Sequence, residues 1–132
     1  MMSEEIYEWA LTMRHKMHSL LTGDVLTETI FPTQVENVMD MTGHITVVSR
    51  KMAEVPRDAT IIVYISGLGQ LTQAVYVAWL NRIRLFGGSL DLWPGDLIFA
   101  HYDFETKTYR AFSAMSGNVY PREWIPYHGA DK

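Results

Sequence analysis

The chain of 132 residues contains no cysteine. This absence excludes disulfide bonds, thiolate metal sites and cysteine nucleophiles, and it is more usual for an intracellular protein than for a small secreted one. The chain also lacks an apolar run of the roughly 18 residues that a membrane-spanning helix needs, and its N-terminal region is charged, unlike a secretory signal. We therefore expect a cytoplasmic protein with no membrane partner.

An excess of positive charge is also missing. The net charge is −4 at pH 7, and acidic and basic residues are interspersed along the chain. Because non-specific nucleic-acid binding relies on clustered Lys and Arg side chains, we do not expect it here. The composition is 48% hydrophobic, which at this length suits one compact core, so residues 1–132 are predicted to form a single domain.

The clearest structural pattern lies at residues 60–80, which read TIIVYISGLGQLTQAVYVAWL. Residues 61–65 are β-branched or aromatic without polar alternation, which is typical of a strand covered on both faces. A glycine-containing turn follows, and the next apolar run is too long for a second strand. This stretch, about a sixth of the chain, resembles the strand, turn and helix of Rossmann-like ligand-binding and sensor domains. The resemblance implies an α/β fold with a small Rossmann-like sheet and flanking helices, but no specific function.

An amphipathic helix is predicted for residues 1–23. Ser3 occupies the position of an N-cap, and Gly23 is suited to end the helix. Apolar residues recur at intervals of three and four, which gives one stripe: Ile6, Trp9, Ala10, Met13, Met17, Leu20 and Leu21. A helix with such a face needs the sheet, another helix or a second subunit to cover it.

A second helix is predicted for residues 33–54, with Thr33 as its cap and an end before Val55-Pro56. The β-branched run at 45–48 also suits a strand, and residues 24–31 suit either an edge strand or a connection. Towards the C-terminus, residues 97–103 and 108–114 are predicted to pair as a β-hairpin, followed by a coil at 118–132.

The turn after the central strand is the first candidate site. Its glycines permit close approach of a ligand, and the free N–H groups at the start of the next helix favour a phosphate or carboxylate. The third glycine of a dinucleotide-binding fingerprint is replaced by a threonine, and no acidic residue ends a second strand at the required spacing. A tight turn capped by its own hydroxyl groups explains the pattern as well. The candidate ligand-binding residues are Ser66, Gly67, Gly69, Gln70 and Thr72.

The second candidate site is His101 with Asp103, at the end of a predicted strand. Alternation places both on one face, where His101 suits a general base or ligand contact and Asp103 suits an orienting group. If this strand lies parallel to and beside strand 61–65, both residues stand near the glycine turn. The alternative is a hairpin in which Asp103 accepts hydrogen bonds from the turn backbone.

Other chemistry has little support in the sequence. His15 and His18 lack partners at metal-ligand spacing, so no metal site is predicted, and no pattern identifies a cofactor. Neither a phosphate-binding Gly-Lys-Ser/Thr loop nor a Gly-x-Ser-x-Gly elbow occurs.

Three hypotheses follow. The first is a small ligand-binding or sensor domain for a nucleotide-type or other anionic ligand at the Ser66 to Thr72 turn. The second is a non-catalytic interaction protein that forms a homodimer or docks on a larger partner, suggested by its apolar helices. The third is a small nucleotide phosphodiesterase with His101 as its base.

Overall fold

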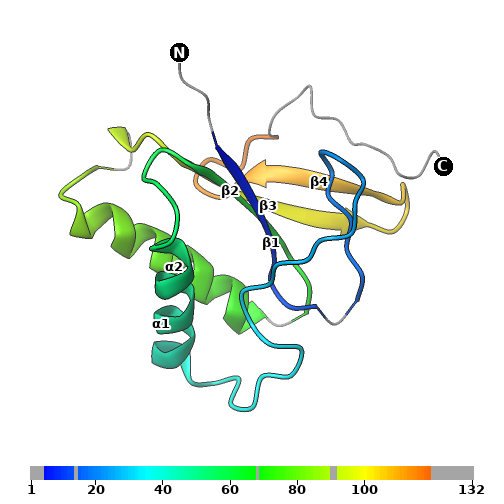
Figure 1. Ribbon diagram of the computed structural model, residues 1–132, viewed down its shortest axis with the longest axis horizontal. Coiled ribbons are helices and arrows are strands. Elements are labelled where there is room, and N and C mark those ends of the chain that lie inside the picture. Colours follow the sequence, from blue (N-terminus) through cyan, green and yellow to red (C-terminus); the bar gives the residue numbers. More distant parts are fainter. Residues whose placement is uncertain (1–4, 14, 68, 90–91, 120–132) are drawn as a thin grey trace.

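The centre of the structure is strand β2 (Thr60–Tyr64), all five residues of which are buried. The computed structural model describes residues 5–13, 15–67, 69–89 and 92–119. It is an α/β structure with a mixed four-stranded sheet and two helices (Figure 1). The other strands are β1 (Ile6–Ala10), β3 (Asp96–Asp103) and β4 (Thr108–Ser113), and the helices are α1 (Met41–Met52) and α2 (Gly69–Leu85). The prediction of an α/β fold is therefore confirmed.

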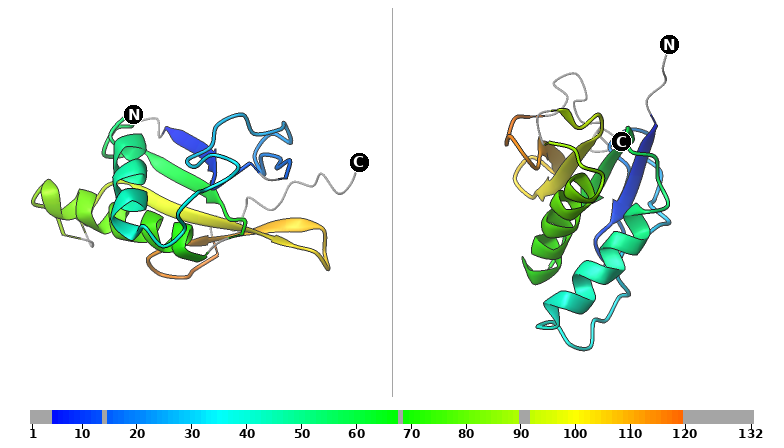
Figure 2. Two further views of the ribbon diagram at one scale, coloured as in Figure 1. Left: turned by 90° about the horizontal axis from the view of Figure 1, so that it is seen from below. Right: turned by 90° about the vertical axis from the view of Figure 1, so that its left-hand side faces the viewer.

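The strands follow one another across the sheet in chain order, β1-β2-β3-β4. β2 is parallel to both β1 and β3, and β4 returns antiparallel to β3 as the predicted hairpin. α1 lies in the connection from β1 to β2, and α2 in that from β2 to β3. Because such crossovers are right-handed and the strand order does not reverse, both helices cover the same face of the sheet (Figures 1 and 2).

Side chains of β2 alternate between two apolar clusters, one on each face of the sheet. Ile61 and Val63 pack with the helices, whereas Ile62 and Tyr64 pack on the opposite face. No helix of the described chain covers that opposite face; residues 15–26, which we call the cover segment, lie over it instead (Figure 2). Three apolar side chains of the cover segment complete this second cluster: Met17, Leu20 and Leu26.

The predicted N-terminal helix is wrong. Residues 6–10 form strand β1, and the described residues 11–13 and 15–23 contain no helix. The spacing of Trp9 and Ala10 fits a helical stripe, but in the strand these two residues enter the clusters on opposite faces of the sheet. Backbone pairing with the apolar β2 strand outweighs the local helical periodicity, because side chains on both faces of β1 find a core to enter.

The second predicted helix exists but is shorter than expected. α1 begins after Asp40 and not at Thr33, and the alternative strand at 45–48 is helical. The side chain of Asp40 accepts a hydrogen bond from the backbone N–H of Gly43 at 3.1 Å. A Cβ atom at Gly43 would lie 2.3 Å from the Asp40 carboxylate, so glycine there makes this cap possible.

α2 packs against both the sheet and the neighbouring α1, which explains why its sequence is apolar on several sides. Arg82 of α2 donates hydrogen bonds to the carbonyl oxygens of Val55 and Pro56, just beyond the end of α1 (both 2.8 Å). Neither helix in the described parts of the chain is long and apolar enough to cross a membrane. The predicted C-terminal coil lies outside the described residues from position 120 onward.

Candidate functional site

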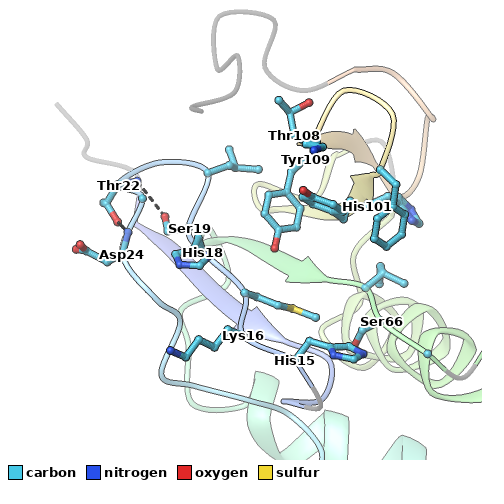
Figure 3. Close-up of a pocket in the computed structure, with 18 residues that line it drawn as sticks. His15, Lys16, His18, Ser19, Thr22, Asp24, Ser66, His101, Thr108 and Tyr109 are labelled. Atoms are coloured by element: carbon cyan, nitrogen blue, oxygen red, sulfur yellow. Dashed lines mark hydrogen bonds between the residues drawn. The ribbon is translucent and has the colours of Figure 1, made fainter. Parts of the chain in front are cut away.

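A cavity of about 1260 Å³ opens at the carboxyl ends of β2 and β3 (Figure 3). Its walls come from three parts of the chain: residues 65–67 after β2, the β3–β4 hairpin, and residues 15–24 of the cover segment. The parallel pairing of β2 with β3 brings the first two parts to the same edge of the sheet. The cover segment, on the face opposite the helices, supplies the third wall.

Three of the residues that the sequence singled out line this cavity: Ser66, Gly67 and His101. Gly67 has a positive φ of 79°, a conformation that glycine adopts without strain. The hydroxyl oxygen of Ser66 lies 3.2 Å from that of Thr12, so this side chain already has a protein partner. The sequence placed these residues near one another on the condition that β2 and β3 are parallel neighbours, and they are.

Gly69, Gln70 and Thr72 are not among the described residues that line the cavity. They lie in the first turn of α2, and the amide nitrogen of Gln70 is 3.6 Å from the sulfur of Met39, away from the hairpin. A Cβ atom added to Gly69 would meet no atom within 4 Å. The structure thus separates the start of the glycine turn, at the cavity, from the helical residues that follow it.

Asp103 points into the hairpin. Its carboxylate accepts hydrogen bonds from the backbone N–H of Glu105 (2.9 Å) and from Nε of Arg110 (3.0 Å). These two contacts, in that order, lower the pKa of Asp103 below its ordinary value. Asp103 is absent from the described cavity lining and has the turn-capping contacts that the sequence allowed as its alternative role.

The ring of His101 lies beside that of Phe112, with 6.3 Å between the ring centroids. Partial desolvation lowers the pKa of His101 below 6.5. His101 is therefore mainly neutral at pH 7 in the free protein. In that form one ring nitrogen can accept a proton or a hydrogen bond, and the other can donate one.

Most of the cavity wall formed by the cover segment was missed by sequence reasoning. His15, Lys16 and His18 fall within the N-terminal helix predicted for residues 1–23, whereas they line the cavity together with Asp24 (Figure 3). The only signal was their local density of basic and imidazole groups. Their position depends on how the cover segment crosses the sheet, which helical periodicity does not reveal.

A hydrogen-bond network fixes the cover segment to the sheet beneath the cavity. The Tyr64 hydroxyl donates to Oε2 of Glu8 (2.7 Å) and accepts from the backbone N–H of Leu20 (2.9 Å). The hydroxyl of Ser19 also reaches both carboxylate oxygens of Glu8 (2.9 and 2.7 Å). Burial, opposed in part by the Leu20 contact, raises the pKa of Tyr64 well above 10, so its hydroxyl stays protonated and can donate.

Within the described parts of the chain, no group of three or more His, Asp or Glu side chains is arranged to hold a metal ion. Comparisons with models of protein families, with curated proteins and with solved structures gave no match to this chain.

Proposed function

We propose that this protein binds a small anionic ligand, of nucleotide type or of another kind, in the cavity at the carboxyl ends of β2 and β3. The supporting observation is the contrast between local and overall charge. The chain carries a net charge of −4, yet the described lining has two ammonium groups, Lys16 and Lys107, against one carboxylate, Asp24. Three imidazoles add hydrogen-bonding groups. Such a wall attracts an anion and disfavours a cation.

The position of the cavity also supports this proposal. Open α/β sheets, the Rossmann-like ones included, bind ligands beyond the carboxyl ends of their parallel strands. In those sheets a reversal of strand order creates the crevice. This sheet has no reversal, and the cover segment provides the missing wall instead. Ser66 and Gly67 line the cavity just after β2, and the Ser66 hydroxyl offers a hydrogen-bonding group at this edge.

Calorimetric titration with phosphate and pyrophosphate tests the proposal. We expect binding to the wild type and a loss of at least about tenfold in affinity for the Lys16→Gln, Lys107→Gln double variant, because two attractive charges are removed. The control is Arg84→Gln, which removes an exposed cation at the far end of α2. If no anion binds the wild type, or if the double variant binds as tightly, the proposal is wrong.

A second candidate is the phosphodiesterase activity that the sequence suggested for His101. His15 and His18 line the same cavity from a different part of the chain, which gives the two proton-transfer groups that phosphodiester cleavage uses. Chromatography of a diribonucleotide incubated with the protein would reveal cleavage. Loss of products in His101→Ala would support this activity, whereas binding without any product would leave a binding protein.

The homodimer remains a proposal of a different class. Leu85 and Phe86 are exposed at the end of α2, and Leu92 is exposed nearby. We propose that the protein is cytoplasmic and forms a homodimer through these exposed apolar residues. Light scattering should then give a dimer mass that a Leu85→Ser, Phe86→Ser variant lowers to a monomer mass. A monomeric wild type would exclude this proposal.

A further inference from the structure

A row of aromatic rings runs from the core to the hairpin turn along one wall of the cavity. The ring of Tyr109 contacts that of Tyr64 edge to face, with 5.1 Å between centroids. Tyr102 contacts Tyr109 at 5.3 Å and Phe104 at 4.9 Å, again with steeply inclined rings. Edge-to-face contacts of this kind fix ring orientation, so each ring in the row is held by the one before it.

Exposure rises along this row. Tyr64 is fully buried, Tyr102 is 40% exposed and Phe104 is 81% exposed. Tyr102, Phe104 and Tyr109 all line the cavity. The row therefore ends in apolar ring surface that faces water at the cavity and that no described residue covers. A planar apolar group placed there would gain contact without displacing a protein side chain.

The remaining walls have a different chemistry. The cover segment presents Lys16, the imidazoles of His15 and His18, and Asp24, the one carboxylate of the described lining. The Ser66-Gly67 turn adds hydrogen-bonding groups. Figure 3 shows the labelled hairpin residues and the labelled cover-segment residues on different sides of the cavity. A ligand that satisfies both kinds of wall carries an aromatic group at one end and an anionic group at the other.

We infer that the ligand is a nucleotide, with its base stacked on Phe104 beside the edge of Tyr102, and its phosphate towards Lys16 and the Ser66-Gly67 turn. This inference rests on the proposed function, because it requires the cavity to bind anions. The cavity, at about 1260 Å³, exceeds the volume of most small-molecule sites and has room for a nucleotide. Stacking on an aromatic side chain tolerates any base, so the hairpin distinguishes nucleotides from simple phosphates more than it distinguishes bases.

The test compares adenosine 5′-monophosphate with ribose 5-phosphate, which carries the same phosphate without the base. We expect the wild type to bind the nucleotide about 10- to 100-fold more tightly, which is the usual effect of stacking one base. Phe104→Ala should remove most of this advantage and leave the affinity for ribose 5-phosphate unchanged. Because Phe104 is exposed, its loss should have little effect on folding.

Two further variants separate stacking from a general loss of apolar surface. Phe104→Trp keeps an aromatic face and should retain the preference for the nucleotide. Phe86→Ala removes a ring that is 58% exposed at the end of α2 and is absent from the cavity lining. This variant should keep the wild-type preference for the nucleotide over ribose 5-phosphate.

The outcomes distinguish the inference from the proposal on which it rests. Equal affinity for the nucleotide and ribose 5-phosphate, or an unchanged preference in Phe104→Ala, would overturn the inference and leave an anion-binding cavity. If neither compound binds, nor inorganic phosphate, both are wrong.

Discussion

At the scale of single residues, His101 is a cavity group whose pKa is shifted by its surroundings. Its pKa is lowered because the ring is partly desolvated beside Phe112. We expect an NMR titration of the free protein to place the midpoint of His101 below 6.5. Phe112→Ala should raise that midpoint towards 6.5 by admitting water. Cross-strand Arg110 is paired with Asp103 and is not a source of the shift.

The lowered pKa of His101 makes the unfolding free energy depend on pH. Between 6.5 and the lower folded value, the unfolded chain binds a proton at this position and the folded chain does not. The contribution of His101 to stability is therefore present above pH 6.5 and is lost as the pH falls through this interval. His101→Asn should reduce the dependence of the unfolding free energy on pH in that interval. An NMR titration midpoint of His101 at or above 6.5 would contradict the partial desolvation of its ring.

Gly95 is a second residue whose role the structure makes testable. A Cβ atom there would lie 2.4 Å from the carbonyl oxygen of Ala59 and 2.6 Å from that of Arg57. Both obstacles are backbone atoms, so Gly95→Ala should lower the unfolding free energy by about 3 kcal/mol. Gly69→Ala is the matched control, because its Cβ has open space and alanine favours the helix. Chemical denaturation should show a lower unfolding free energy for Gly95→Ala and a higher one for Gly69→Ala, relative to the wild type. Equal stability of the two variants would contradict this role of Gly95.

The candidate site was predictable from the sequence only where local pattern determines position. Ser66, Gly67 and His101 each follow or end an apolar strand, and neighbouring parallel strands end at one edge of the sheet. Asp103 has the same strand position but is bound by the backbone of its own turn. That competition between a turn contact and a ligand contact was visible in the sequence but not decided by it.

At the scale of elements, the first strand shows why periodicity can mislead. Within residues 6–10 an apolar stripe satisfies both a helix and a strand that is covered on its two faces. The residue that distinguishes them is Glu8. On the predicted helix Glu8 lies off the stripe and faces water, whereas in β1 its carboxylate accepts hydrogen bonds from Ser19 and Tyr64.

Replacing Glu8 therefore tests the strand directly. Glu8→Ala should lower the unfolding free energy by about 2 kcal/mol, because the buried Tyr64 hydroxyl and the Ser19 hydroxyl lose their acceptor. Glu28→Ala, which removes an exposed ion pair with Lys51, should cost less than about 1 kcal/mol. Urea denaturation gives both values. Similar small losses would favour a solvent-facing Glu8 and the helix that the structure rejects.

At the scale of the whole molecule, the order of the strands decides where the cavity lies. The sequence predicts the β2–α2 unit but not β1, and the side on which a crossover lies depends on the order in which strands pair. Here the order puts both helices on one face and leaves the other to the cover segment, which has no regular element of its own. A residue in the cover segment can thus line the site although no local pattern marks it.

The two faces should also differ in local stability. β2 is hydrogen-bonded on both edges and fully buried, so its amides should exchange only when the whole molecule unfolds. The N–H group of Leu20 bonds to the Tyr64 hydroxyl of the sheet at 2.9 Å, whereas that of Leu26 bonds within the cover segment, to the carbonyl oxygen of Met17 at 2.8 Å. We expect these two amides to exchange by local opening, measurably faster than that of Ile62.

Native-state hydrogen exchange followed by NMR measures this difference, and a nucleotide or phosphate at saturating concentration extends the test to function. Since residues 15–24 form a wall of the cavity, a bound ligand should slow exchange at Leu20 more than its effect on global stability explains. Leu26 lies outside the cavity lining and serves as the internal comparison. If Leu20 and Ile62 exchange at the same rate in the free protein, the cover segment unfolds together with the sheet, and the cavity wall does not open independently.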